Sequence, residues 1–276
     1  KMLLPVMLPA AVTTTSGSVS YLYAYDTAAI GISGGTVINC HTYDATTANI
    51  SGPVTNQYAH DNSVVGLSGR ATLISADGNS TVNMAGMATT ILGAGMSTLN
   101  VSGGLTTTLQ SRETSTVNFT GGRVGSLSTY NSSDANMTGG RVTGSLATYD
   151  TSSVTISDGV VASLSTYDFS IAALSGGSVS NLSAYETSTV AIYGYGFTLG
   201  AGLALVGSDV TGTGVLSGRW LDGTSWDLTI SAHDVTASIW LIEAPVTLKP
   251  LAGDADEDGD DDMVDYAILK AHMGQM

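Results

Sequence analysis

The sequence repeats itself at intervals of 17 to 19 residues, and this period constrains the fold more than any other feature. A Ser/Thr-Gly-like step recurs from Ser16-Gly17 to Tyr193-Gly194, which gives ten units between residues 16 and 192. A unit of this length is too short to enclose a hydrophobic core alone, so each unit must hydrogen-bond to the next. The repeat therefore predicts an all-β, single-stranded parallel β-helix (a β-solenoid) of about ten rungs, stacked about 4.8 Å apart.

Alignment of the units places apolar residues in columns that alternate with polar or small residues. Two columns lie two residues apart, as at Val154 and Ile156, and a third column includes Leu109 and Leu127. Alternation with a period of two is typical of a strand with one buried face. The glycine steps tolerate the backbone angles of a tight corner. An antiparallel sandwich would need hairpin turns at irregular intervals, and the constant register argues against it.

One outward column is rich in tyrosine and lies beside a column of acidic residues and asparagine. Its tyrosines are Tyr25, Tyr43, Tyr130, Tyr149, Tyr167 and Tyr185. In one interpretation the rings stack between rungs and stiffen the solenoid. In the other, the aligned aromatic rings form a contact stripe for another chain or for sugar rings.

Several asparagines lie in Asn-X-Ser/Thr sequences, which are acceptors for N-glycosylation. They are Asn49, Asn79, Asn100, Asn118, Asn131, Asn136 and Asn181. Four of them, Asn49, Asn100, Asn118 and Asn136, fall in one outward column with Asn83. Stacked asparagines also stabilise neighbouring strands through amide hydrogen bonds. Since Ser and Thr are abundant in this chain, the ladder is the favoured interpretation and glycosylation the alternative.

Segments of different composition flank the repeat. Residues 1–15 contain the apolar stretch Met2–Leu8, which is expected to cap the first rung or to act as a donor strand, unless it is a leader remnant. Residues 16–196 are the solenoid repeats. Residues 197–250 hold all three tryptophans and are predicted to form a β-rich C-terminal cap, because the last rung of a solenoid exposes unpaired backbone groups.

The last part, residues 251–276, contains an acidic segment with the spacing of a calcium-binding loop. From residue 254 onward, carboxylates fall at alternate positions and Gly259 stands at the sixth, where such a loop turns sharply. The expected metal-binding residues are Asp254, Asp256, Asp258, Asp260, Asp262 and Asp265. Residues 266–273 are predicted to form a short helix. The sequence thus predicts an EF-hand-like site with Ca²⁺ as its cofactor.

This loop and helix, residues 253–274, resemble the calcium-binding half-repeat of a type I dockerin, the module that docks into cohesin domains in bacterial surface assemblies. The resemblance implies a cohesin-like partner. The stretches 192–197 and 218–223 also look like the end of autotransporter-like or dockerin-bearing repeat proteins that bacteria export. These likenesses imply a secreted bacterial protein located outside the cell or on its surface.

Charge and composition exclude several classes of function. The chain has 8 Lys+Arg against 23 Asp+Glu, a net charge of −15, which argues against binding nucleic acid. No apolar run approaches the roughly 20 residues that span a bilayer. The single cysteine, Cys40, excludes an internal disulfide framework.

Catalysis is not expected, because the rungs carry few charges, almost no long loop insertions and no histidines at metal-binding spacing. The leading hypothesis is a non-enzymatic extracellular structural protein, a rod that self-associates into a fibre or filament with a calcium-stabilised C-terminus. One alternative is an adhesin, or a carbohydrate- or cohesin-binding module that uses the tyrosine column on a surface glycan. A weaker alternative is an enzyme similar to the polysaccharide lyases built on β-helices.

Overall fold

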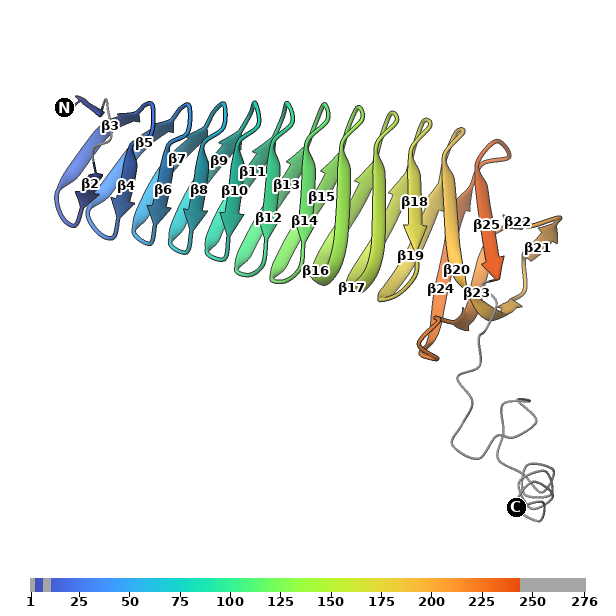
Figure 1. Ribbon diagram of the computed structural model, residues 1–276. Coiled ribbons are helices and arrows are strands. Elements are labelled where there is room, and N and C mark those ends of the chain that lie inside the picture. The colour runs from blue at the N-terminus through green and yellow to red at the C-terminus, as the bar shows by residue number, and fades with distance from the viewer. Residues whose placement is uncertain (1–2, 7–10, 244–276) are drawn as a thin grey trace, which may run out of the picture. The chain divides into compact units, whose positions relative to one another are not determined.

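The computed structural model describes residues 3–6 and 11–243, and these wind into a β-solenoid (Figure 1). Every regular element in this part of the chain is a strand, and the 25 strands join into one continuous sheet. The described residues up to Ile242 make up one compact unit. The predicted calcium loop and helix of residues 251–276 lie outside the described residues.

Each repeated rung contains a seven-residue strand, a tight turn, a four-residue strand and a glycine-containing corner. The seven-residue strands are β3 (Ser18–Ala24), β5 (Thr36–Thr42), β7 (Pro53–Ala59), β9 (Arg70–Ala76), β11 (Met87–Gly93), β13 (Leu105–Ser111), β15 (Arg123–Thr129) and β19 (Ser178–Ala184). The four-residue strands are β4 (Ala29–Ile32), β6 (Thr47–Ile50), β8 (Val64–Leu67), β10 (Thr81–Met84), β12 (Thr98–Val101), β14 (Thr116–Phe119) and β18 (Ile171–Leu174). In β16 (Asp134–Thr148) and β17 (Ser153–Thr166) the strand continues through the corner.

Equivalent strands of successive rungs pair in parallel, with equivalent residues opposite one another. Leu109 of β13 pairs with Ile91 of β11 on one side and with Leu127 of β15 on the other. This register confirms the predicted β-solenoid of about ten rungs. It also explains the columns in the sequence, because each residue lies directly above its equivalent one rung earlier.

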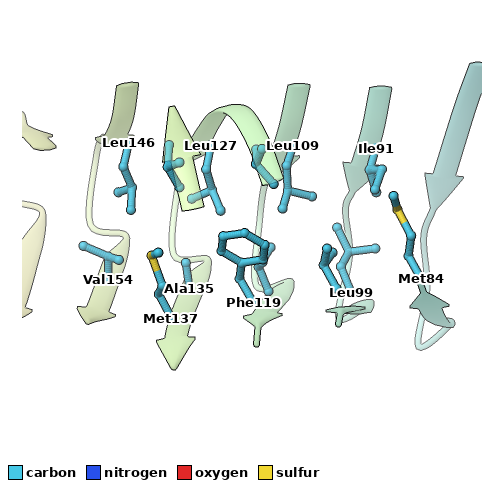
Figure 2. Packing of buried hydrophobic residues seen from close by; sticks show 14 of the residues in the cluster. Met84, Ile91, Leu99, Leu109, Phe119, Leu127, Ala135, Met137, Leu146 and Val154 are labelled. Atoms are coloured by element: carbon cyan, nitrogen blue, oxygen red, sulfur yellow. The ribbon is translucent and has the colours of Figure 1, made fainter. Parts of the chain in front are cut away.

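The core runs along the inside of the rungs. The second and fourth residues of a four-residue strand are buried, as are the second, fifth and seventh residues of a seven-residue strand. Figure 2 shows two facing rows of these side chains, with Leu109 and Leu127 in one row and Phe119 in the other. The apolar columns of the sequence are therefore the core, and Val154 and Ile156 belong to it.

The tight turn after each seven-residue strand holds one residue in the left-handed region. Its φ lies between 54° and 61° in the non-glycine cases, which are Asp26, Asp44, Asp61, Glu113, Asn131, Asp150, Asp168 and Glu186. Gly78 and Gly95 occupy the same position in two other rungs. Asn and Asp tolerate this conformation better than most residues. The acidic column of the sequence is thus the left-handed position of the turn.

The apolar N-terminal segment adds strands to the solenoid of its own chain. β1 (Leu3–Val6) pairs in parallel with β3, and β2 (Ala11–Thr14) pairs in parallel with β4. These strands take the places that a preceding rung would provide.

A further rung follows the point at which the sequence period fails. β24 (Ser225–His233) pairs in parallel with β19, and Leu182 lies opposite Ile230. The Ser238 amide, at the start of β25 (Ser238–Glu243), donates to the Ser188 carbonyl, as the equivalent groups do between earlier rungs. Residues 225–243, predicted as part of the cap, therefore resume the solenoid. The period fails at Tyr193 because residues 193–224 are inserted between two rungs.

The inserted residues cover the last rung. β20 (Thr189–Leu199) extends beyond its rung, and β23 (Gly214–Arg219) pairs antiparallel with both β20 and β24. β21 (Leu203–Val206) and β22 (Asp209–Gly212) form an antiparallel hairpin, and Asp209 of β22 pairs with Trp240 of β25. β23 occupies the edge of β24 that faces away from β19 along Ser225–Ile230, so it covers most of the edge that the last rung would otherwise expose.

Candidate functional site

The C-terminal half of the tyrosine column is a continuous ring stack. The ring centroids of Tyr130 and Tyr149 are 4.9 Å apart, those of Tyr149 and Tyr167 4.8 Å, and those of Tyr167 and Tyr185 4.9 Å. The ring planes lie within 13° of parallel. The Arg112 guanidinium lies 5.4 Å from the Tyr130 centroid and covers the free face at that end.

The N-terminal half of the same column mixes tyrosine with histidine. Tyr25 stacks on Tyr43 at 4.9 Å, and Tyr43 stacks on His60 at 4.5 Å. His60 Nδ1 lies 2.9 Å from a carboxylate oxygen of Asp77, the next residue of the column. Within the described residues, this is the one salt bridge between side chains.

A second aromatic column, which the sequence analysis missed, lies beside the first. His41 stacks between Tyr23, at 4.9 Å, and Tyr58, at 4.4 Å. Burial, followed by the charge of His60, lowers the pKa of His41. The signal was present in the sequence, because these three residues stand two positions before Tyr25, Tyr43 and His60 in their units.

Stacking leaves few ring faces available to a ligand. Tyr149 has a ring on each face, and so does Tyr167. Burial and the neighbouring tyrosines raise the pKa of Tyr149, so its phenol is neutral at physiological pH. Recognition of a sugar by stacking needs an open ring face, and these two tyrosines present only edges and hydroxyl groups.

The acidic column forms a second ladder, which runs from rung to rung through the backbone. The Asp150 amide donates to Asp168 Oδ2 at 2.9 Å, and the Asp168 amide donates to Glu186 Oε2 at 2.7 Å. The Glu186 amide donates to Asp234 Oδ2 at 3.0 Å, which carries the ladder into the rung formed by residues 225–243. Each carboxylate thus satisfies a turn amide of the rung before it.

The asparagine column forms a third ladder. Asn100 Nδ2 donates to Asn83 Oδ1 at 2.8 Å, Asn118 Nδ2 to Asn100 Oδ1 at 2.9 Å, and Asn136 Nδ2 to Asn118 Oδ1 at 3.2 Å. Asn49 is separated from this ladder by Gly66, which has no side chain to continue it. The side-chain nitrogens that a glycan would modify on Asn100, Asn118 and Asn136 are therefore donors in the ladder.

The other three asparagines of the acceptor sequences lie outside this column. Asn79 Nδ2 donates to Asn62 Oδ1 in the turns. Asn131 Oδ1 accepts from the Glu113 amide, and Asn181 Nδ2 donates to the Ala162 carbonyl. All three side chains are exposed, and their glycosylation stays a prediction.

Three features bear on catalysis: metal-holding groups, the single cysteine and the clefts. Among the residues that the structure describes, no three His, Cys, Asp or Glu side chains lie close enough to hold a metal ion. Cys40 is buried, and burial raises its pKa to about 12, which removes it as a nucleophile. One cleft of about 450 Å³ lies beside the cap and is lined by Asp158, Asp222, Asp227 and the stacked pair Trp220 and Trp226.

Comparison with protein-family models, with curated proteins and with solved structures gave no match to this chain. In the part of the chain described by the structure, no helix has the length and hydropathy needed to cross a membrane. The six predicted calcium ligands lie outside the described residues.

Proposed function

We propose that this protein is a non-enzymatic structural protein of the bacterial cell exterior, in which the solenoid is a stiff, self-associating rod. The observation that carries the proposal is that the side chains of the outward columns contact one another from rung to rung. Rings stack on rings, carboxylates accept turn amides, and amides pair with amides. Side chains committed to such contacts stiffen a rod, because bending it would separate every ladder on the outer side.

Self-association along the sides of the rod is favoured over stacking at the C-terminal end. β24 pairs with β19 on one edge, and β23 pairs along Ser225–Ile230 on the other, so a second copy could add along that stretch only by displacing β23. The sides of the rod, in contrast, present repeated rows of exposed side chains. A fibre or sheet of this protein would therefore grow through lateral contacts.

The adhesin alternative is weaker on the same geometry. A sugar ring stacks on an exposed aromatic face, whereas Tyr149 and Tyr167 have both faces covered by neighbouring rings. The tyrosine column is instead explained by ring stacking between neighbouring rungs of the same chain.

The acidic segment at residues 254–265 extends the proposal to calcium. Six of the seven aspartates in these twelve residues are the expected oxygen ligands for Ca²⁺, and the dockerin-like pattern suggests that the loaded segment binds a cohesin-like protein or stabilises the C-terminus. Titration calorimetry of the full chain with CaCl₂ tests this directly. Asp254→Asn/Asp258→Asn should abolish the binding heat, and the control Asp222→Asn, in the cap, should leave it unchanged. Equal heats from both variants would remove calcium from the proposal.

The location and the role are tested on the producing bacterium. Antibodies against the solenoid should label intact cells or material shed from them. Purified protein should show rods by electron microscopy, with lateral association that depends on concentration. Labelling that appears only after lysis would overturn the proposal.

A further inference from the structure

One row of exposed side chains combines positive charge with apolar surface. The row consists of the first residue of the seven-residue strand segment in five successive rungs, and these residues pair in register. They are Arg70, Met87, Leu105, Arg123 and Arg141. We name this row the basic edge. Three of the five arginines of the described residues lie in it.

The basic edge has a hollow at its centre. Met87 is 42% exposed and Leu105 45%, and both line a hollow of about 120 Å³ together with Arg70. Within the described residues, Arg70, Arg123 and Arg141 form no salt bridge. An apolar centre rimmed by charge is typical of a protein interface.

The complementary surface lies at the other end of the seven-residue segment. Phe169 is 68% exposed at the tip of a turn, next to the ladder formed by Asp150, Asp168, Glu186 and Asp234. We name these five residues the acidic ridge. In the ladder, Asp168 Oδ2 and Glu186 Oε2 accept turn amides, which leaves the second oxygen of each carboxylate for another partner.

We infer that the basic edge of one rod binds the acidic ridge of a second copy, with Phe169 seated on Met87 and Leu105. This inference rests on the proposed self-associating rod and names its interface. A second copy is the partner that the geometry favours, because both rows follow the same rung spacing.

Seating Phe169 between Met87 and Leu105 fixes how far the two rods are shifted along their axes. Phe169 follows β17, three rungs beyond the rung of Leu105 and four beyond that of Met87. Two parallel rods with Phe169 between Met87 and Leu105 are therefore staggered by about three and a half rungs, or about 17 Å at the usual strand spacing.

With this stagger, each arginine of the basic edge lies within about half a rung, about 2.4 Å along the axis, of a carboxylate. Asp150 then lies beside Arg70, and Glu186 lies beside Arg123. Asp234 lies between Arg123 and Arg141. Since the two surfaces differ and lie at opposite ends of the strand segment, each rod uses one surface toward each neighbour, and the contact repeats into an open sheet.

The experiment measures the mass of the full chain by sedimentation at low and at high salt. The wild-type chain should associate at low salt and dissociate as salt screens the ion pairs. Phe169→Ser should weaken association by about tenfold or more, as expected for a buried aromatic anchor. Serine or threonine already occupies this turn position at Ser132 and Thr151, so the fold should persist.

Met96→Ser is the matched control. Met96 occupies the same turn position and is 64% exposed, but its turn and the preceding one carry glycine, Gly95 and Gly78, in place of the acidic residue. This variant should associate as the wild-type chain does. Arg70→Glu/Arg123→Glu/Arg141→Glu should be monomeric at low salt, with an unchanged circular dichroism spectrum.

A disulfide trap tests the seating itself. An oxidised mixture of Phe169→Cys and Leu105→Cys chains should form cross-linked dimers, and a mixture of Met96→Cys and Leu105→Cys chains should not. Cys40 is buried and does not interfere.

At low salt and about 100 μM protein, even a weak complex would form. A wild-type chain that stays monomeric under these conditions would overturn the inference. The location at the cell surface would still be tested separately by the labelling experiment. Association that the arginine variant loses and Phe169→Ser keeps would also overturn it, and would point to the acidic residues 254–265 as the partner of the basic edge.

Discussion

Single residues at the glycine corners decide how closely the rungs approach. Gly104 has a φ of +75°, and an added Cβ would lie 1.5 Å from the Gly86 carbonyl oxygen of the rung before. Gly17 has a similar φ of +84°, but nothing lies within 4 Å of the same position. Substitutions at these two glycines therefore distinguish the effect of backbone strain from the effect of a clash between rungs.

Gly104→Ala should destabilise the solenoid far more than Gly17→Ala. Both substitutions pay the strain of a left-handed residue, about 1–2 kcal/mol, and only Gly104→Ala adds a clash with the backbone. Urea unfolding followed by circular dichroism measures both free energies. Equal losses of stability would mean that the rungs separate easily at this corner.

The half-buried His41 of the second aromatic column makes stability depend on pH. Because burial and His60 lower the pKa of His41 in the folded chain, the unfolded chain binds a proton more readily. The stabilising effect of the neutral ring is complete above the unfolded pKa of about 6.5 and is lost as pH falls below it.

His41→Tyr should therefore narrow the difference in melting temperature between about pH 7.5 and about pH 5, conditions on either side of the histidine pKa. Tyrosine preserves the stacking with Tyr23 and Tyr58. Thermal unfolding of both proteins at both pH values is the measurement. An unchanged difference would mean that other groups control the pH dependence.

At the scale of the element, the ladders link rungs that the core already holds together. Tyr149 contacts a ring above and a ring below, and each such contact contributes about 0.5–1.5 kcal/mol beyond the buried area. The hydroxyl group takes no part in this stacking.

Tyr149→Ala should cost about 1–3 kcal/mol of unfolding free energy, and Tyr149→Phe should cost little, because phenylalanine retains both ring contacts. Chemical denaturation measures the two values. A large loss for Tyr149→Phe would show that the hydroxyl group also contributes to stability and that stacking alone does not hold this position.

Elements were predictable from the sequence to different degrees. The columns gave the inward strands directly, because stacked rungs repeat the same environment every 17 to 19 residues. The rung formed by residues 225–243 could not be predicted, since the insertion before it breaks the period. Its pairing with β19 depends on a contact between residues about 50 positions apart.

At the scale of the whole molecule, the inserted segment protects the open edge of the last rung. Trp220 joins it to the solenoid, since its indole Nε1 donates to the Gly177 carbonyl at 2.9 Å and its ring stacks on Trp226. Loss of these contacts would free β23 and expose the edge of β24.

Trp220→Ala should therefore make the protein prone to aggregate through its C-terminal edge. Light scattering during incubation at moderate temperature measures this, and Trp240→Ala is the control, because Trp240 is 46% exposed. If the two variants remain equally soluble, β23 is held by its strand pairing alone.

The sequence by itself determined the repeat, the inward and outward columns and the acidic segment at residues 254–265. Each of these is a local pattern that recurs or stands complete within a few residues. Only the tertiary structure decided which outward groups bond to each other, that residues 225–243 rejoin the solenoid, and that β23 covers its end. Those outcomes depend on distances between residues far apart in the chain, which composition and period leave open. The basic edge and the acidic ridge belong to this second class, because their alignment exists only once the rungs are stacked.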